Sequence, residues 1–368
     1  MSRILIAGGG TAGHVVPALA IADVLTERGY AVHFCGGPHG MESGLVTRAG
    51  YPFSSVRIRG FERRLGLTTL RTLASLPVAA VDAWATLRRL RPACVVGVGA
   101  YASGPVVAEA AVARIPSVAL EMDAHLGWTN RILSMLVDRV CLSFPIPGRV
   151  GGKFVYTGRP VRPSLLTATR EQGLERFSLD PALPVVLVFG GSLGARSMNT
   201  AAIEAFARGE TPFSVIHVTG TADRERVAEA LRGRRAVECA NPRYQTHAYL
   251  DDFELALAAA DVAVARAGGS VAELLARGIP SVLVPFPAAT ADHQTKNALG
   301  LQAEGAALLL PDAELSGERL AAEVARVLEP RRHAGMRERA AALARPDAAT
   351  RIADEIVQLA GPPRAPTL

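Results

Sequence analysis

The chain has 368 residues, of which 49% are hydrophobic and 20% charged, so it is long enough for two globular domains with a core each. The formal net charge of +6 is compatible with phosphate ligands, nucleic acid or an anionic membrane and selects none of them. The four cysteines show no metal-binding spacing, and no apolar run reaches the roughly 18 residues of a membrane-spanning helix. We therefore expect an intracellular protein that is soluble or at most attached to a membrane face.

The N-terminal half opens with a strand, a glycine-rich turn and a helix. Residues 3–7 are predicted to form a buried strand, 8–13 read GGGTAG, and 17–27 carry a helical pattern. This order is typical of a doubly wound α/β domain, which binds ligands at the carboxyl ends of its strands. The spacing is not the GxGxxG of a dinucleotide site. His14, where turn and helix meet, is as compatible with a structural role as with a chemical one.

Further strands are predicted at 30–36, 55–58, 93–97, 117–120 and 139–143. The fourth of these, 117–120, delivers Glu121, Met122 and Asp123 to its carboxyl end. Two acids directly after a buried strand indicate that at least one is functional, with a solvated loop as the alternative.

The segment 60–92 mixes apolar residues with arginines. A helix pair with solvated arginines explains this composition. A surface that contacts a membrane, with arginines at anionic head groups, explains it as well.

The second half repeats the plan of the first. Residues 184–189 are predicted to form a strand, GGSLGARSMN a glycine-rich turn, and 200 onward a helix, so that VLVFGGSLGAR parallels ILIAGGGTAGH. We place an N-terminal domain at 1–160, a C-terminal domain at 161–345, and a terminal helix and tail at 346–368 that packs back on the N-terminal domain. The fold class is α/β, with two doubly wound Rossmann-like domains.

The stretch 263–298 predicts a strand, a small-residue turn, a helix near Ser270, a second strand and a polar loop. Backbone N–H groups at the turn, where the helix dipole also favours an anion, suit a phosphate. Glu273 can accept hydrogen bonds from two ribose hydroxyls. An ordinary helix cap followed by a solvated loop, carrying Asp292, His293, Gln294 and Asn297, is the alternative.

Two such domains joined by a short crossover follow the logic of the GT-B glycosyltransferases, with ligand-facing edges across a cleft. The sequence resembles the MurG-type family, which transfers N-acetylglucosamine from UDP-GlcNAc to the lipid-linked muramyl-pentapeptide of peptidoglycan synthesis. The resemblance covers almost the whole chain and rests on ordered motifs. These are GGGTAGHVVPALAIA, GVGAYASGPVVAEA, a glutamate after IPSVAL with GWTNR, GRPVRP, GGSLGARSMN, RAGGSVAEL and VPFPAATADHQTKNA.

The resemblance implies roles for matching positions in both halves of the chain. Glu273 matches the residue that binds the ribose hydroxyls, Leu250 the backbone contact to uracil, and Gln294 the glutamine at the sugar hydroxyls. Asp123 stands where the family has an asparagine that touches the donor sugar. The other positions are Thr11, Ala12, Gly13 and His14 beside the sugar and acceptor, Arg162 and Ser192 at the donor, and Gly269, Ser270, Val271 and Ala272 at phosphate and ribose.

The resemblance further implies an inverting, single-displacement transfer, with His14 or Glu121 as the base. Without a DxD motif we expect no obligatory metal and no cofactor. The expected partners are UDP-GlcNAc, a lipid-linked acceptor and the cytoplasmic face of the membrane, to which the protein binds peripherally. No nucleic acid is expected, because the positive charge is dispersed.

Three other functions stay open at this point. The sequence Leu120-Glu121-Met122-Asp123 replaces the family's His-Glu-Gln-Asn. A diverged paralogue that glycosylates another acceptor would explain that change. A UDP-GlcNAc 2-epimerase-like enzyme shares the architecture, and a non-catalytic UDP-sugar-binding protein would also explain the altered stretch.

Overall fold

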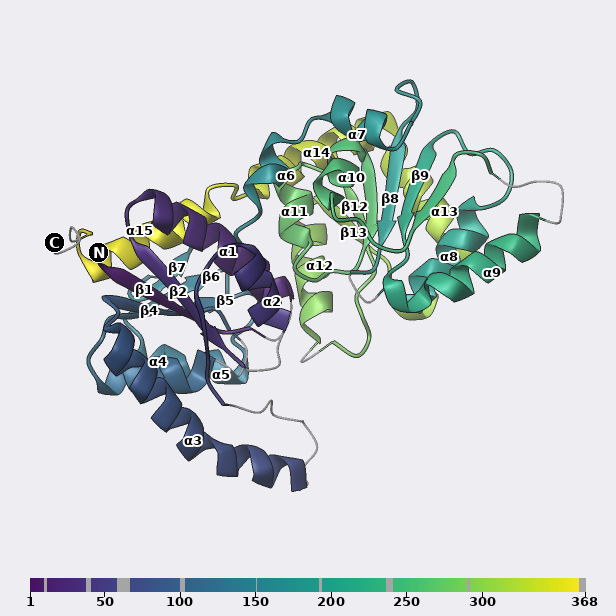
Figure 1. Ribbon diagram of the computed structural model, residues 1–368. Helices are drawn as coiled ribbons and strands as arrows, with labels where there is room; N and C mark the ends of the chain where they lie inside the picture. Colours follow the sequence, from purple (N-terminus) through teal and green to yellow (C-terminus); the bar gives the residue numbers. More distant parts are fainter. Residues whose placement is uncertain are drawn as a thin grey trace. The chain divides into compact units, whose positions relative to one another are not determined.

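The computed structural model describes residues 1–9, 12–37, 41–57, 67–99, 103–149, 151–191, 194–235, 241–289 and 292–363, with the backbone alone at 12, 41, 67–76 and 233–235 (Figure 1). The chain forms two compact units, one of Met1–Arg162 with Arg345–Leu368, the other of Pro163–Ala344. The boundaries between the two units lie within two residues of the domain boundaries placed from the sequence, 160/161 and 345/346. Arg162, however, closes unit 1 instead of belonging to the second domain.

Unit 1 is built on a seven-stranded parallel sheet in the order β3-β2-β1-β4-β5-β6-β7. Its central strands β1, β4 and β5 are largely apolar because both faces of a parallel sheet are covered. In β1, Ile4 and Ile6 face one core, and Leu5 and Ala7 the other. The strands are β1 (Arg3–Ala7), β2 (Ala31–Gly36), β3 (Phe53–Ser55), β4 (Cys94–Gly97), β5 (Ser117–Glu121), β6 (Arg139–Leu142) and β7 (Phe154–Tyr156).

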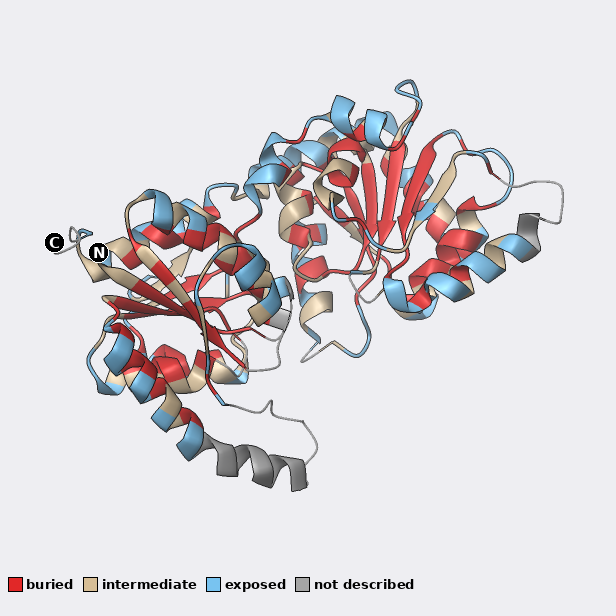
Figure 2. Ribbon diagram, viewed as in Figure 1, coloured by how far each residue is buried: buried red, intermediate tan, exposed pale blue. Residues whose placement is uncertain are grey.

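Helices cover both faces of this sheet (Figures 1 and 2). On one face lie α1 (Ala12–Glu27), α2 (Met41–Arg48) and α15 (Ala348–Ala360). On the other lie α3 (Leu67–Leu90), α4 (Gly104–Val112) and α5 (Trp128–Leu136). The two cores are thus separate layers on either side of the strands, which Figure 2 shows as buried.

The C-terminal helix α15 belongs to unit 1 and packs along α1. Ile352 and Ile356 are fully buried in the first core; burying each side chain is worth about 1.5–3 kcal/mol. The Tyr30 hydroxyl donates to the carbonyl oxygen of Gly361 over 2.6 Å. An ion pair joins Arg139 to Glu355 (3.0 Å).

Unit 2 holds a six-stranded parallel sheet in the order β10-β9-β8-β11-β12-β13. The strands are β8 (Val185–Phe189), β9 (Ser214–Val218), β10 (Tyr244–His247), β11 (Val262–Ala265), β12 (Ser281–Leu283) and β13 (Ala307–Leu309). The helices are α6 (Pro163–Thr167), α7 (Arg170–Arg176), α8 (Arg196–Phe206), α9 (Arg224–Arg235), α10 (Phe253–Ala259), α11 (Val271–Ala276), α12 (His293–Ala303), α13 (Gly317–Leu328) and α14 (Pro330–Leu343), with 3₁₀ turns η2 (Thr221–Asp223) and η4 (Asp312–Glu314). The fold class is confirmed as two parallel, doubly wound α/β units.

Three local predictions were wrong. The segment His293–Ala303 is a helix instead of a polar loop, because Asn297, Ala298 and Leu301 recur at helical spacing and are buried together. The helix pair predicted within 60–92 is a single helix, α3, in its described part, and Pro77 does not end it. The third strand lies at Phe53–Ser55, earlier than predicted. Within the described residues, no helix is long and apolar enough to cross a bilayer.

Candidate functional site

In unit 1, the strand order brings two predicted positions, His14 and Glu121, and the glycine Gly99 to one edge of the sheet. β1, β4 and β5 are neighbours and parallel, so their carboxyl ends lie side by side. His14 follows β1, Gly99 follows β4, and Glu121 ends β5. Ligands of doubly wound folds bind at this edge.

His14 is half-buried in the first turn of α1, and its ring lies against Gly99. A Cβ on Gly99 would lie 3.0 Å from the imidazole Cδ2, and the φ of +88° at Gly99 also favours glycine. Burial lowers the pKa of His14 to about 4; nearby Arg159 lowers it further, and Asp123 opposes the shift. The imidazole is therefore neutral at neutral pH and able to accept a proton.

Glu121 is buried, and hydrogen-bond donors surround its carboxylate. Oε1 accepts from the N–H of Asp123 (3.1 Å), and Oε2 from the N–H of Gly127 (2.9 Å) and from Asn130 Nδ2 (3.0 Å). Burial raises the pKa of this carboxyl, while the three hydrogen bonds oppose that shift. Glu121 thereby shapes the turn from β5 to α5 and places the half-buried Asp123 beside His14.

Arg159 completes this edge, and sequence reasoning missed it although it belongs to the GRPVRP motif. Its Nη1 donates to the carbonyl of Met122 (3.1 Å), and its Nη2 to the carbonyl of Gly13. Four residues after Gly13 stands Pro17, inside α1, which has no N–H to donate back to that carbonyl. The position of Pro17, four residues after Gly13, was therefore the signal in the sequence that the Gly13 carbonyl needs a hydrogen-bond donor from elsewhere in the chain.

In unit 2, the predicted donor segment follows β11. α11 begins at Val271, and its first amides are already used: Val271 N–H donates to Gly268 and Ala272 N–H to Gly269. Glu273 is half-buried in the first turn of α11. A phosphate at this turn would therefore be bound by the amides of Gly269 and Ser270.

Gln294 lies on α12 with its amide group oriented. Oε1 accepts from the N–H of Phe286 (2.9 Å), so Nε2 is directed toward the turn after β11, where a Cβ on Gly268 would lie 3.6 Å away. Next on the helix, buried Asn297 donates from Nδ2 to the carbonyl of Ala267 (3.0 Å). The predicted residues Gln294 and Glu273 thus flank one turn from two helices.

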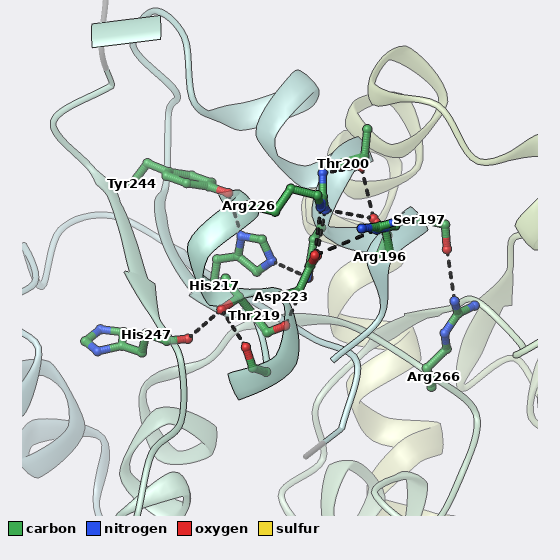
Figure 3. A network of polar contacts seen from close by, with 12 residues as sticks. Arg196, Ser197, Thr200, His217, Thr219, Asp223, Arg226, Tyr244, His247 and Arg266 are labelled. Atoms are coloured by element: carbon green, nitrogen blue, oxygen red, sulfur yellow. Dashed lines mark hydrogen bonds and ion pairs between the residues drawn. The ribbon is translucent and has the colours of Figure 1, made fainter. Parts of the chain in front are cut away.

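Arg266, directly before this turn, was also missed by sequence reasoning. The residue is 9% exposed. Its Nη1 donates to the carbonyls of Val284 (3.1 Å) and Pro285 (3.0 Å) and to Asp312 Oδ1 (2.6 Å). Nη2 donates to Ser197 Oγ (3.0 Å), a contact drawn in Figure 3. Arg266 therefore joins the ends of β11 and β12 to the start of α8.

The remaining predicted residues are placed as follows. Leu250 is buried in the loop between β10 and α10, and Arg162 is exposed at the end of unit 1. Thr11 and Ser192 lie outside the described residues, and of Ala12 only the backbone is described. Among the described residues, no three His, Cys, Asp or Glu side chains gather as metal ligands would.

Comparison with known proteins identifies the family of the chain. The N-terminal domain model of glycosyltransferase family 28 matches residues 4–142, and the C-terminal domain model matches 185–352. The chain is therefore a family 28 glycosyltransferase.

Relatives define the family more closely. A UDP-N-acetylglucosamine–N-acetylmuramyl-(pentapeptide) pyrophosphoryl-undecaprenol N-acetylglucosamine transferase of Desulforudis audaxviator is 39% identical over 98% of this chain and 99% of its own. The transferase of that name from Moorella thermoacetica is also 39% identical, over 97% of this chain and 98% of its own. The crystal structure of Acinetobacter baumannii MurG matches with a TM-score of 0.78 at 27% identity, covering 97% of this chain and 100% of that one. The chain belongs to this family of N-acetylglucosamine transferases.

Proposed function

We propose that this enzyme transfers N-acetylglucosamine from UDP-GlcNAc to a lipid-linked muramyl-pentapeptide, the step from lipid I to lipid II. The observation that carries the proposal is the near-complete alignment with transferases of that name. The polar residues at the carboxyl edges of both sheets support it, since each half presents the groups that one substrate requires.

The donor binds to unit 2 in this proposal. Glu273 accepts hydrogen bonds from the ribose hydroxyls, and the amides of Gly269 and Ser270 bind phosphate. The backbone at Leu250 contacts the uracil. Because Phe286 occupies the Oε1 of Gln294, this side chain recognises sugar hydroxyls by donating from Nε2.

His14 is the general base in this proposal. It is neutral because of its burial, and it lies at the edge where the acceptor hydroxyl would attack the anomeric carbon. The alternative, Glu121, already accepts three hydrogen bonds, so we assign it to positioning the loop that carries Asp123. His14→Ala should reduce turnover while UDP affinity stays unchanged; a turnover within a few-fold of wild type would return the role to Glu121.

We further propose that the leaving UDP needs no obligatory metal ion, because backbone N–H groups at the turns after β8 and β11 stabilise the charge that develops on the β-phosphate. Turnover in EDTA should equal turnover in buffer with Mg²⁺. A requirement for Mg²⁺ at saturating donor would contradict this assignment.

We also propose that the protein attaches to the cytoplasmic face of the membrane. An exposed apolar surface on unit 1, which we call the α3–α5 face, supports this proposal. On α3, Val81 and Trp84 are 62% and 51% exposed, and Arg88 lies 4.9 Å above the Trp84 ring. On α5, Trp128 is 81% exposed and pairs with Arg131. Apolar side chains beside arginines suit a bilayer with anionic head groups.

Vesicle sedimentation tests this attachment. Trp84→Ser combined with Trp128→Ser should lower binding to vesicles that contain phosphatidylglycerol. Leu299→Ser, at a residue of unit 2 that is 48% exposed, is the matched control and should bind as wild type does. Equal binding by all three proteins would remove the α3–α5 face as the contact.

Release of UDP from a panel of UDP-sugars, with and without a short-chain lipid-linked muramyl-pentapeptide, tests the function itself. We expect acceptor-dependent release from UDP-GlcNAc. Release with another acceptor only would indicate a diverged paralogue marked by Asp123. Formation of the 2-epimer without acceptor would indicate an epimerase, and UDP binding without release a non-catalytic protein.

A further inference from the structure

Arg159 extends from a fixed piece of backbone at the carboxyl edge of the unit 1 sheet. It follows β7, and the N–H groups of Thr157 and Gly158 both donate to the carbonyl of Leu142 at the end of β6, over 3.1 Å each. Thr157 is fully buried. Gly158 has a φ of +86°, and a Cβ there would clash with the side chain of Arg345. The backbone that carries the Arg159 side chain is therefore anchored to the sheet.

The Arg159 guanidinium joins two peptide groups from distant parts of the chain. Its Nη2 donates to the carbonyl of Gly13 at the start of α1, and its Nη1 to the carbonyl of Met122 after β5 (3.1 Å). Each carbonyl belongs to the residue directly before a predicted site residue, His14 in the first case and Asp123 in the second. One side chain thus fixes the backbone on which both site residues are carried.

The peptide group between Gly13 and His14 depends on this contact. In a regular helix its carbonyl would accept from the N–H four residues later, but that residue is Pro17, which has no N–H. Arg159 supplies the donor that the helix cannot. The position of the first turn of α1, which carries the imidazole, is therefore set from outside the helix.

The peptide group between Met122 and Asp123 is bonded at both ends. Its N–H donates to Glu121 Oε1 (3.1 Å), and its carbonyl accepts from Arg159 Nη1. A rotation of this peptide group would break both hydrogen bonds together. Arg159 and Glu121 therefore hold the backbone at Asp123 in a single orientation.

Charge links the same three side chains a second time. Position 123 is acidic in this chain, whereas the family that the sequence resembles has an asparagine there. The carboxylate of Asp123 raises the pKa of His14, and the guanidinium of Arg159 lowers it. Of the other groups at this edge, Gly99 carries no charge, and the Glu121 carboxylate faces the N–H groups of the turn to α5. Arg159 therefore opposes the effect of the acidic residue and favours a neutral imidazole.

We infer that Arg159 is a positioning residue of the unit 1 site, which holds the peptide groups that carry His14 and Asp123 and compensates the charge of the acid at position 123. The inference rests on the proposed function, in which His14 is the general base. It deepens that function, because it assigns both the placement and the neutrality of the base to one residue that does not itself react.

Four variants separate position from charge. Arg159→Lys keeps the charge, but an ammonium group lacks the planar fork that serves two carbonyls. Arg159→Met removes charge and donors, and its combination with Asp123→Asn removes the opposing charge as well. Arg3→Met is the matched control: Arg3 Nη1 also donates to a carbonyl, that of Leu90 (2.6 Å), but Arg3 begins β1 and so lies at the opposite edge of the sheet.

The readouts are kcat for acceptor-dependent UDP release, the acid limb of kcat/KM, and UDP affinity by calorimetry. Arg159→Lys and Arg159→Met should each lower kcat by about 10–10², the loss that a displacement of about 1 Å causes. Both should bind UDP within about twofold of wild type, because unit 2 is unchanged. The acid limb should move to higher pH in Arg159→Met, stay in place in Arg159→Lys, and move back toward wild type when Asp123→Asn is added. Arg3→Met should change none of the three.

A kcat within about twofold of wild type in Arg159→Met, or an equal loss of kcat in Arg3→Met, would overturn the positioning role. An acid limb that stays in place in Arg159→Met, or that Asp123→Asn does not move back, would contradict the charge compensation. Arg159→Gln, which keeps one donor and no charge, replaces Arg159→Met if that variant does not fold. Wild-type protein without acceptor-dependent UDP release, or an acid limb that persists in His14→Ala, would refute the proposed function instead.

Discussion

The pH dependence of His14 gives a sharp test of the unit 1 site. With a pKa of about 4, the imidazole is about 97% neutral at about pH 5.5, whereas an unperturbed histidine of pKa about 6.5 would be only about 9% neutral. If His14 is the base, kcat/KM should be almost flat from about pH 8 to about pH 5.5 and fall with unit slope near pH 4. The profile of kcat/KM reports the free enzyme, which is the state that the structure describes.

The assay is continuous detection of UDP release with a water-soluble lipid I analogue across that pH range. The diphosphate groups of bound substrates carry negative charge, so the acid limb of kcat should lie at higher pH than that of kcat/KM. His14→Ala should lower kcat by about 10²–10⁴ and abolish the limb. A unit-slope fall of kcat/KM centred near pH 6.5 in wild type, or a limb that persists in His14→Ala, would refute the assignment.

Four further predictions follow from the described contacts. Glu273→Ala should weaken UDP and UDP-GlcNAc binding together, and unchanged affinity for both would remove it from the ribose site. Gly99→Ala should lose about 1–2 kcal/mol of stability at its positive φ and lower kcat through its contact with His14, measured by urea unfolding and turnover. Arg159→Met should raise the pKa of His14, seen as a shift of the acid limb to higher pH. Burial lowers the pKa of His217 in the folded state, so below about pH 6.5 the unfolded state binds more protons and the free energy of unfolding should fall as the pH drops. His217→Gln should make this fall less steep. An unchanged pH dependence of the free energy of unfolding would contradict the role of His217.

The sequence was most informative where a parallel strand runs into a glycine-rich turn. β1 and β8 match the predicted runs because strands buried on both faces are continuously apolar. Glu121 and Asp123 could be placed at a ligand edge for the same reason. The helix α12 could not be predicted, because its N-terminal turn is polar and its buried residues begin only at Asn297.

Tertiary contacts between residues that lie far apart in the chain were only weakly indicated by the sequence. Arg159 reaches Gly13 across 146 residues, and only the missing N–H of Pro17 indicates that the carbonyl needs a donor. Asn199 and His217 meet because α8 packs beside β9, which no local pattern encodes. Such residues become visible only when the strand order is known.

The return of α15 to unit 1 has a consequence for the order of folding on the ribosome. The polypeptide leaves unit 1 at Arg162 and comes back at Arg345, so all of unit 2 is synthesised in between. Until then, the surface of α1 that α15 covers stays open, and the first core lacks Ile352 and Ile356. The second unit can therefore complete its own core before the first one does, and the nascent N-terminal unit keeps apolar surface of its first core exposed until the last helix emerges.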